Sequence, residues 1–312
     1  MKKANKRLFS LIFLIVLIPT IYARDSTENT ENSNIKQKTK LLISELKYFK
    51  LAYPDIDFSQ KYDKEQNDWI ITVKTPDAKK NSSNGTDFYW ADGSLLPKEE
   101  LENAENYWPV LYSYPKELKD PAEYTEEERL QIKEYGSKES RKNGAGTPMF
   151  VFDEIYDSYT RGKLEKQLKR ITFLGKNTTI HKRIEVPLKK VEEKIYAQKE
   201  DAEIKAFLEN IKSVDSYNWR IIEGTKRKSF HSLGIAIDIL PKKQGGKQIF
   251  WNWARSKYPN TWMLIPLKDR WIPPEKVIQI FEEEGFIWGG KWVIYDNMHF
   301  EYHPELVEFN LK

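Results

Sequence analysis

Apolar residues recur along the chain with two kinds of pattern, and each predicts a different element. In the first half, helical spacing predicts helices over 37–53, 96–107 and 126–135. Short runs of β-branched and aromatic residues predict strands over 68–74 and 88–90, the second of which enters a tight turn. A stretch rich in Lys, Asn, Ser and Gly lies between these strands and indicates a loop.

The second half of the chain mixes helical and strand patterns more closely. Its predicted elements are helices from 187, at 204–211 (extending or restarting the first), at 248–253 and from 273 to 285, and strands at 235–240, 292–295 and 298–302. Helices followed by short strands mixed with helices indicate an α+β fold. We expect a small antiparallel sheet with flanking helices, preceded by a mixed N-terminal region.

The first residues carry the pattern of an export signal. Four cations among the first seven residues precede an apolar run over 8–18, and Ala23 offers a small residue for cleavage. The run is shorter than the roughly 20 residues of a spanning helix, although an uncleaved anchor is the alternative. We therefore expect a signal peptide over 1–23, a polar linker over 24–36, and an exported protein of the periplasm or cell envelope.

A composition shift divides the remainder. Residues 137–147 are small, polar and charged, so we expect a boundary there, between a region of unknown role over 37–147 and a second domain over 148–312. The first region holds scattered aromatics that could stack on glycan rings, or pack against the second domain.

Composition removes several classes of protein. The chain has no cysteine, which excludes disulfide scaffolds, thiolate metal sites, cysteine nucleophiles and a lipid anchor on cysteine. The net charge of +4 comes from the four cations of the signal segment, since the remaining chain has 47 residues of each sign. Charge thus indicates no nucleic-acid partner, and a membrane contact only if the signal segment is uncleaved.

One of the four histidines, His231, lies in the segment SFHSLGIAID. Asp238 stands in the middle of an apolar strand there, and a buried carboxylate is costly unless it is paired or bound to a metal. Gly234 can supply a turn that brings His231 to the same side as Asp238, and Ser229 can hold that turn.

A second histidine, His299, lies in the segment DNMHFEYH. In a strand it shares a face with Glu301 and His303, and Asp296 lies just before it. The set His231, Asp238 and His299 matches a zinc site with three protein ligands and an open position, and a nearby carboxylate suits a proton acceptor. A lone histidine in a strand is more often a structural residue than a ligand, so the prediction depends on the two segments combined.

The two segments resemble the signatures SxHxxGxAxD and [DE]xxH of peptidase family M15, the zinc D-alanyl-D-alanine carboxypeptidases and L-alanyl-D-glutamate endopeptidases of VanY, VanX and endolysin type. The resemblance extends over about 148–308. It implies a Hedgehog-like fold, with Zn²⁺ held by His231, Asp238 and His299. It further implies Asp296 as the general base and Arg220 as the group that stabilises the oxyanion.

These features predict a VanY-like zinc metallopeptidase that removes terminal D-alanine from peptidoglycan stem peptides. The alternatives are an endopeptidase of the same family and a non-catalytic, zinc-containing wall-binding protein. We expect His303 to be exposed, His181 to be structural and Arg227 to be solvated. Glu301 either orients a ligand or faces solvent, and the two tryptophans at 288 and 292 either line the cleft or pack in the core.

Overall fold

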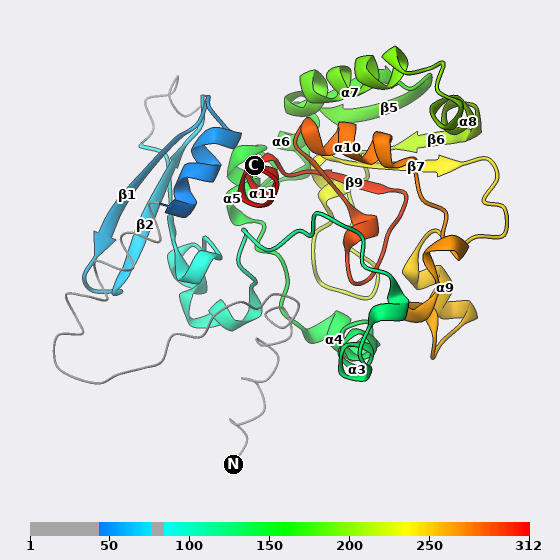
Figure 1. Ribbon diagram of the computed structural model, residues 1–312. Coiled ribbons are helices and arrows are strands. Elements are labelled where there is room, and N and C mark those ends of the chain that lie inside the picture. The colour runs from blue at the N-terminus through cyan, green and yellow to red at the C-terminus, as the bar shows by residue number, and fades with distance from the viewer. Residues whose placement is uncertain (1–43, 77–83) are drawn as a thin grey trace. The chain divides into compact units, whose positions relative to one another are not determined.

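The computed structural model describes residues 44–76 and 84–312 (Figure 1). The predicted signal, the linker, the first part of the predicted helix over 37–53 and most of the predicted loop lie outside these residues. The chain divides into the units Met1–Lys47 and Tyr48–Lys312. Of the first unit the structure describes only 44–47, which are helical, and the helix runs on to residue 52.

The unit Tyr48–Lys312 has the predicted α+β fold. Its strands are β1 (Asp57–Asp63), β2 (Asp68–Lys74), β3 (Thr86–Tyr89), β4 (Leu168–Phe173), β5 (Lys176–His181), β6 (Ile211–Asp215), β7 (Ala236–Pro241), β8 (Phe286–Trp288) and β9 (His299–Tyr302). Its α-helices are α3 (Glu126–Tyr135), α4 (Lys138–Asn143), α5 (Phe150–Ile155), α6 (Arg161–Glu165), α7 (Glu185–Ala197), α8 (Ala202–Asn210), α9 (Trp251–Lys257), α10 (Glu275–Glu283) and α11 (Pro304–Asn310). None of the helices in the described part of the chain has the length and apolar character needed to cross a bilayer.

The strands form three antiparallel sheets, with the orders β1-β2-β3, β4-β5 and β6-β7-β9-β8. In the four-stranded sheet, β9 comes last in the chain but lies between β7 and β8. The strand that carries Asp238 and the strand that begins with His299 are therefore hydrogen-bonded neighbours. This pairing positions the site described below.

Helices cover the four-stranded sheet because their apolar stripes match its buried side chains. Helix α10 packs against β8 and against α7 (Figure 1). The Phe281 ring of α10 stacks on Phe300 of β9 with a centroid separation of 4.0 Å. Along α7 the predicted stripe of Leu188, Val191 and Ile195 is fully buried, which confirms the helix and its inward face.

Several predicted elements agree with the structure and three differ from it. Strand β2 and helix α3 have the predicted bounds, but the predicted helix at 96–107 is a 3₁₀ helix over Lys98–Asn106 that buries no residue. The predicted strand over 292–295 is wrong: Gly289–Lys291 form a 3₁₀ turn, and 292–295 are irregular. Only the part of 248–253 from Trp251 onward is helical.

The segment 137–147, predicted as a domain boundary, contains α4, whose N-terminus is capped by Ser137. Residues on both sides of it belong to the compact unit Tyr48–Lys312. Arg227 donates hydrogen bonds to the carbonyl oxygens of Arg141 and Ala145, at 3.0 and 3.1 Å. Arg227 is thus partly buried rather than solvated, and the division at 147 stays a prediction.

Candidate metal centre

His231 lies in a one-turn 3₁₀ helix over Phe230–Leu233. The Ser229 hydroxyl accepts a hydrogen bond from the His231 N–H at 3.2 Å, and Gly234 ends the turn in the left-handed conformation, with φ of +69°. A Cβ atom at Gly234 would lie 2.9 Å from the His181 nitrogen. The turn predicted from Ser229 and Gly234 is therefore confirmed, and it aims His231 at Asp238.

Strand pairing brings the other two residues together, since Asp238 of β7 and His299 of β9 are directly opposite each other. The His299 Nδ1 atom lies 2.7 Å from Asp238 Oδ1, and His231 Nε2 lies 3.2 Å from Asp238 Oδ2. The two inner nitrogens, His231 Nε2 and His299 Nδ1, are 3.2 Å apart. Three potential ligand atoms thus converge on one point.

The outer nitrogens of the two rings show which atoms are free to bind a cation. His231 Nδ1 lies 2.7 Å from the Ser216 carbonyl oxygen, which can only accept, so Nδ1 carries the hydrogen. His299 Nε2 lies 2.8 Å from Glu301 Oε1, and donates to that carboxylate. His231 Nε2 therefore presents a lone pair. Although burial opposes the charged ring, Asp238 and Glu301 hold the pKa of His299 well above its usual range, so His299 Nδ1 shares a proton with Asp238 until a cation takes the place of that proton.

The donor set fits zinc. Two lone pairs and a carboxylate facing one another repel unless a cation or protons lie between them. Ligand atoms at about 2.0–2.1 Å from a tetrahedral zinc ion lie roughly 3.3 Å from each other, which is close to the two separations of 3.2 Å seen here. Two imidazoles and one carboxylate also leave a position open for water, as in catalytic zinc sites.

Charge around the centre is dominated by burial and by the histidine–carboxylate contacts. Burial alone would raise the pKa of Asp238. The contacts with His231 and His299 outweigh burial and bring this pKa well below its ordinary value. Burial also opposes the charged form of Glu301, yet its contacts with His299 and His303 lower the pKa of this carboxyl to about 2. Both carboxylates are therefore negative at neutral pH.

Asp296 has the environment of a group that exchanges a proton. Its Oδ1 atom is buried and has no hydrogen-bond partner in the described structure. Burial, reinforced by the negative charges of Asp238 and Glu301, raises the pKa of Asp296 to about 7 even though His299 opposes this. Perturbed carboxyls of this kind occur at catalytic sites.

Arg220 is attached to the His231 turn through its backbone. Its N–H donates to the Ser232 hydroxyl at 2.9 Å, and that hydroxyl donates to the Arg220 carbonyl at 2.7 Å. Arg220 itself is exposed, and its guanidinium makes no ion pair within the described residues. The backbone is therefore fixed beside the metal ligands while the cation remains available to a ligand.

The exposed fractions of three side chains test three further predictions about this region. His303 was expected to be exposed, which is wrong: it is 2% exposed and lies between Glu301 and Glu305. The pairing matters here, because a buried imidazole needs partners on both nitrogens and two glutamates supply them. Glu301 is buried and orients His299, whereas Trp288 is a core residue, 1% exposed.

Some residues of the centre had no individual signal in the sequence. Ser216 contributes a backbone carbonyl, which any residue would offer. Glu305 had none either, because β9 ends at Tyr302 and Glu305 belongs to α11, so alternation along the strand does not place it beside His303.

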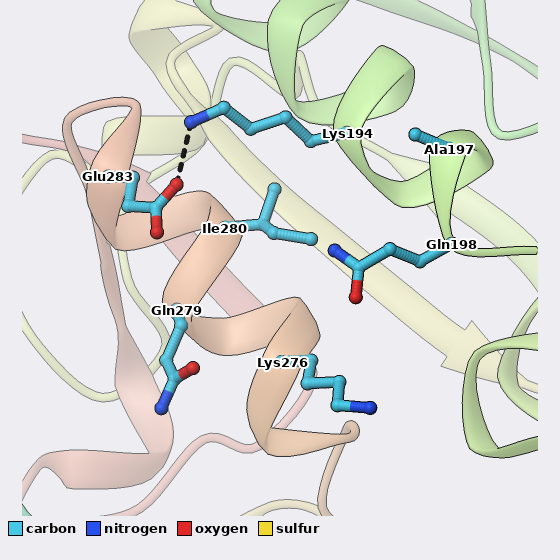
Figure 2. A pocket seen from close by; sticks show the side chains of 7 residues that line it. All are labelled: Lys194, Ala197, Gln198, Lys276, Gln279, Ile280 and Glu283. Carbon is cyan, nitrogen blue, oxygen red and sulfur yellow. Dashed lines mark hydrogen bonds and ion pairs between the residues drawn. The ribbon is translucent and has the colours of Figure 1, made fainter. Parts of the chain in front are cut away.

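Two hollows found among the described residues lie away from the three ligands. One, of 320 Å³, opens between α7 and α10, where Lys194 pairs with Glu283 and Ile280 faces Gln198 (Figure 2). A larger one, of 630 Å³, is lined by residues that include Trp288 and Val307. Neither is lined by a residue of the triad or by Asp296.

Comparison with known proteins bears on the segment that builds the centre. Residues 223–302 match a family model described as D-alanyl-D-alanine carboxypeptidase. This match contains the triad and Asp296, begins just after Arg220, and supports a peptidase of the M15 type. Residues 45–112 match a domain of unknown function (DUF8518). Searches of curated proteins and of solved structures found no match.

Proposed function

We propose that this protein is an exported zinc metallopeptidase that hydrolyses peptidoglycan stem peptides as a D,D-carboxypeptidase. The observation that carries the proposal is the convergence of His231, Asp238 and His299, with the inner nitrogens of two imidazoles facing one carboxylate. It gains support from its place within the stretch that matches a carboxypeptidase family.

The residues around the triad can supply the remaining chemistry. Zinc bound there would contribute Lewis acidity, which lowers the pKa of a water and polarises a carbonyl. Asp296 then takes a proton from the attacking water and delivers it to the amine that leaves as the C–N bond breaks. Its unpartnered Oδ1 and its pKa near 7 suit both transfers.

Arg220 is proposed to stabilise the negative charge that develops on the carbonyl oxygen. A guanidinium held beside the reacting centre is worth most where charge appears only in the transition state. The hydrogen bonds of Ser232 to the Arg220 backbone support this role, because they hold the base of the side chain at the His231 turn.

The test uses the purified chain without its first 23 residues, with bound metal quantified in parallel. It is incubated with a pentapeptide stem ending in D-Ala-D-Ala and with intact muropeptides, and the products are identified by mass. We expect loss of a single alanine, abolished by a chelator and restored by zinc. Cleavage between L-Ala and D-Glu would instead make the protein an endopeptidase, and stoichiometric zinc with no cleavage would favour a non-catalytic binding protein.

A further inference from the structure

A line of buried ionisable side chains leads away from the metal centre. From His299 it passes to Glu301 at 2.8 Å, to His303 at 3.2 Å and to Glu305 at 2.7 Å. The Tyr53 hydroxyl then donates to the second oxygen of Glu305, at 2.7 Å, and also lies 3.3 Å from the Tyr156 hydroxyl. We call Glu301, His303, Glu305 and Tyr53 the relay.

The relay is closed off from solvent. Its four members are between 0% and 8% exposed. The rings of Phe152 and Phe230 meet His303 edge-on, at centroid separations of 5.4 and 4.6 Å. Buried charges of this kind rarely improve stability over apolar residues of the same size, so fold stability alone does not account for them.

Hydrogen bonding fixes nearly every proton in the relay. Glu301 accepts from both His299 and His303, and Glu305 accepts from Tyr53, which leaves one proton between His303 Nδ1 and Glu305 Oε1. Although burial opposes its charged form, the glutamates raise the pKa of His303 to about 9, which assigns that proton to the imidazole.

The resulting charge complements the metal centre. Two carboxylates and one imidazolium leave the relay with one net negative charge behind His299. A divalent cation bound together with the Asp238 carboxylate would leave one net positive charge. The two regions thus balance each other in a low-dielectric interior, where an uncompensated charge is costly.

We propose that the relay positions the metal ligand, because it fixes the ring of His299 and places a negative charge behind it, so that affinity for metal depends on hydrogen bonds reaching as far as Tyr53. The inference rests on the proposed function only in taking the triad as a zinc site. It also assigns a role to the stretch 45–112, which contains Tyr53 and matches a domain of unknown function.

The experiment measures zinc affinity of the full mature chain by competition with a chromophoric chelator. Glu301→Gln keeps an acceptor but removes the charge, and is expected to weaken binding about 10–100-fold, as for other partners of metal-bound histidines. Glu305→Gln and Tyr53→Phe act from farther away, and each is expected to weaken binding roughly 3–10-fold, the worth of one hydrogen bond. The absorption spectrum of the cobalt-substituted chain should shift in the same order.

A matched control distinguishes the effect of breaking the relay from the general effect of removing a buried tyrosine hydroxyl. Tyr114 is also buried and donates to a glutamate, Glu282, which is not part of the relay. Tyr114→Phe should therefore lower stability as Tyr53→Phe does, with zinc affinity and the cobalt spectrum unchanged. Thermal unfolding of the metal-free variants verifies that each is folded, and Tyr53→Phe, which keeps the ring, carries the test if Glu305→Gln does not fold.

The outcomes separate this inference from the proposed function. Wild-type zinc affinity in folded Tyr53→Phe and Glu305→Gln overturns the relay, even if the chain hydrolyses stem peptides. Weaker affinity in these variants supports the relay, even if no stem peptide is cleaved. A chain that binds no divalent cation contradicts both.

Discussion

Asp296 and His231 differ in what each is expected to contribute, although both belong to the same centre. Asp296→Ala removes the proton acceptor but no ligand, so the chain should keep its zinc while the turnover number falls by about 10²–10⁴-fold. His231→Ala removes a ligand and should lose both zinc and hydrolysis. Metal analysis beside the mass assay measures both effects.

An exposed aspartate serves as the control for these variants. Asp269→Ala removes a carboxylate of the same size at a solvent-facing position and should alter neither zinc content nor rate. Equal activity in Asp296→Ala and wild type would remove Asp296 as the base.

His181 makes the stability of the protein sensitive to acid. Its Nε2 donates to the Tyr156 carbonyl at 3.1 Å, and its Nδ1 accepts from the Arg183 N–H at 3.1 Å, so the second bond requires the neutral ring. Burial, with smaller contributions from the charges of Arg183 and Lys182, lowers the pKa of His181 to about 3.

The sign of this effect follows from where the proton binds. The unfolded chain takes up the proton at a pKa of about 6.5 and the folded chain only near 3, so stability is fully present above pH 6.5 and is lost as pH falls. We expect a loss on the order of 1 kcal/mol per pH unit between about pH 6.5 and 5. Urea unfolding of wild type and of His181→Asn, which retains an acceptor for Arg183, measures it; equal slopes would contradict the assignment.

At residue scale the sequence predicted the convergence of His231, Asp238 and His299 and the turn at Gly234, and the structure has both. The roles of these residues and of Asp296 stay predictions. Asp238 interrupts an apolar strand, and Gly234 lies between it and His231. The burial of His303 was predicted wrongly because its partner Glu305 belongs to the next element, and the neighbouring Pro304 suggests a surface turn. Local sequence does not reveal a partner supplied by tertiary packing.

Among the elements, the turn over Phe230–Leu233 is the one on which the centre depends most directly. Gly234→Ala forces an alanine into a left-handed conformation and drives its Cβ to within 2.9 Å of the His181 nitrogen and 3.0 Å of the Leu168 side chain. We expect a destabilisation of about 2–4 kcal/mol together with weaker zinc binding. Denaturant unfolding and the chelator competition measure the two effects.

Gly175 provides the matched control, because it has a similar φ of +72° and an added Cβ there would meet no atom within 4 Å. Gly175→Ala should therefore lose only about 1–2 kcal/mol and leave zinc affinity unchanged. Equal losses at the two positions would show that contacts at Gly234 are unimportant.

Elements were predicted well where one face is apolar and poorly where it is not. Helix α7 has a complete buried stripe, whereas β1 reads DFSQKYD and has only Phe58 buried. Strand β1 was not predicted because its sequence has no apolar alternation, and its backbone is held by pairing with β2. The order β7-β9-β8 could not be predicted, since the position of a strand in a sheet is set by contacts distant in sequence.

For the whole molecule, the question is whether residues 148–312 fold without the region before them. That region supplies Tyr53 to Glu305, two carbonyl oxygens to Arg227, and Tyr114 to both Glu282 and the Trp288 N–H. Each buried group left without a partner costs about 1–3 kcal/mol, and a domain has a stability of only about 5–15 kcal/mol.

We therefore expect the fragment 148–312 to unfold at a temperature at least about 10 °C below that of the chain 37–312, or to lack a cooperative transition. Calorimetry of the two proteins measures this, and zinc titration should show weaker binding by the fragment. A fragment with the melting temperature of the longer chain would instead establish 148–312 as an autonomous domain.

The hydrogen bond between Tyr53 and Glu305 joins residues separated by 252 positions. Closing so long a loop has a large entropic cost, and contacts of high sequence separation form slowly. The ligands Asp238 and His299 are only 61 positions apart, so they can meet while the distant end of the relay is still open. A refolding chain should accordingly pass through a state that holds zinc loosely, and the release rate of the metal should slow when the two distant segments join.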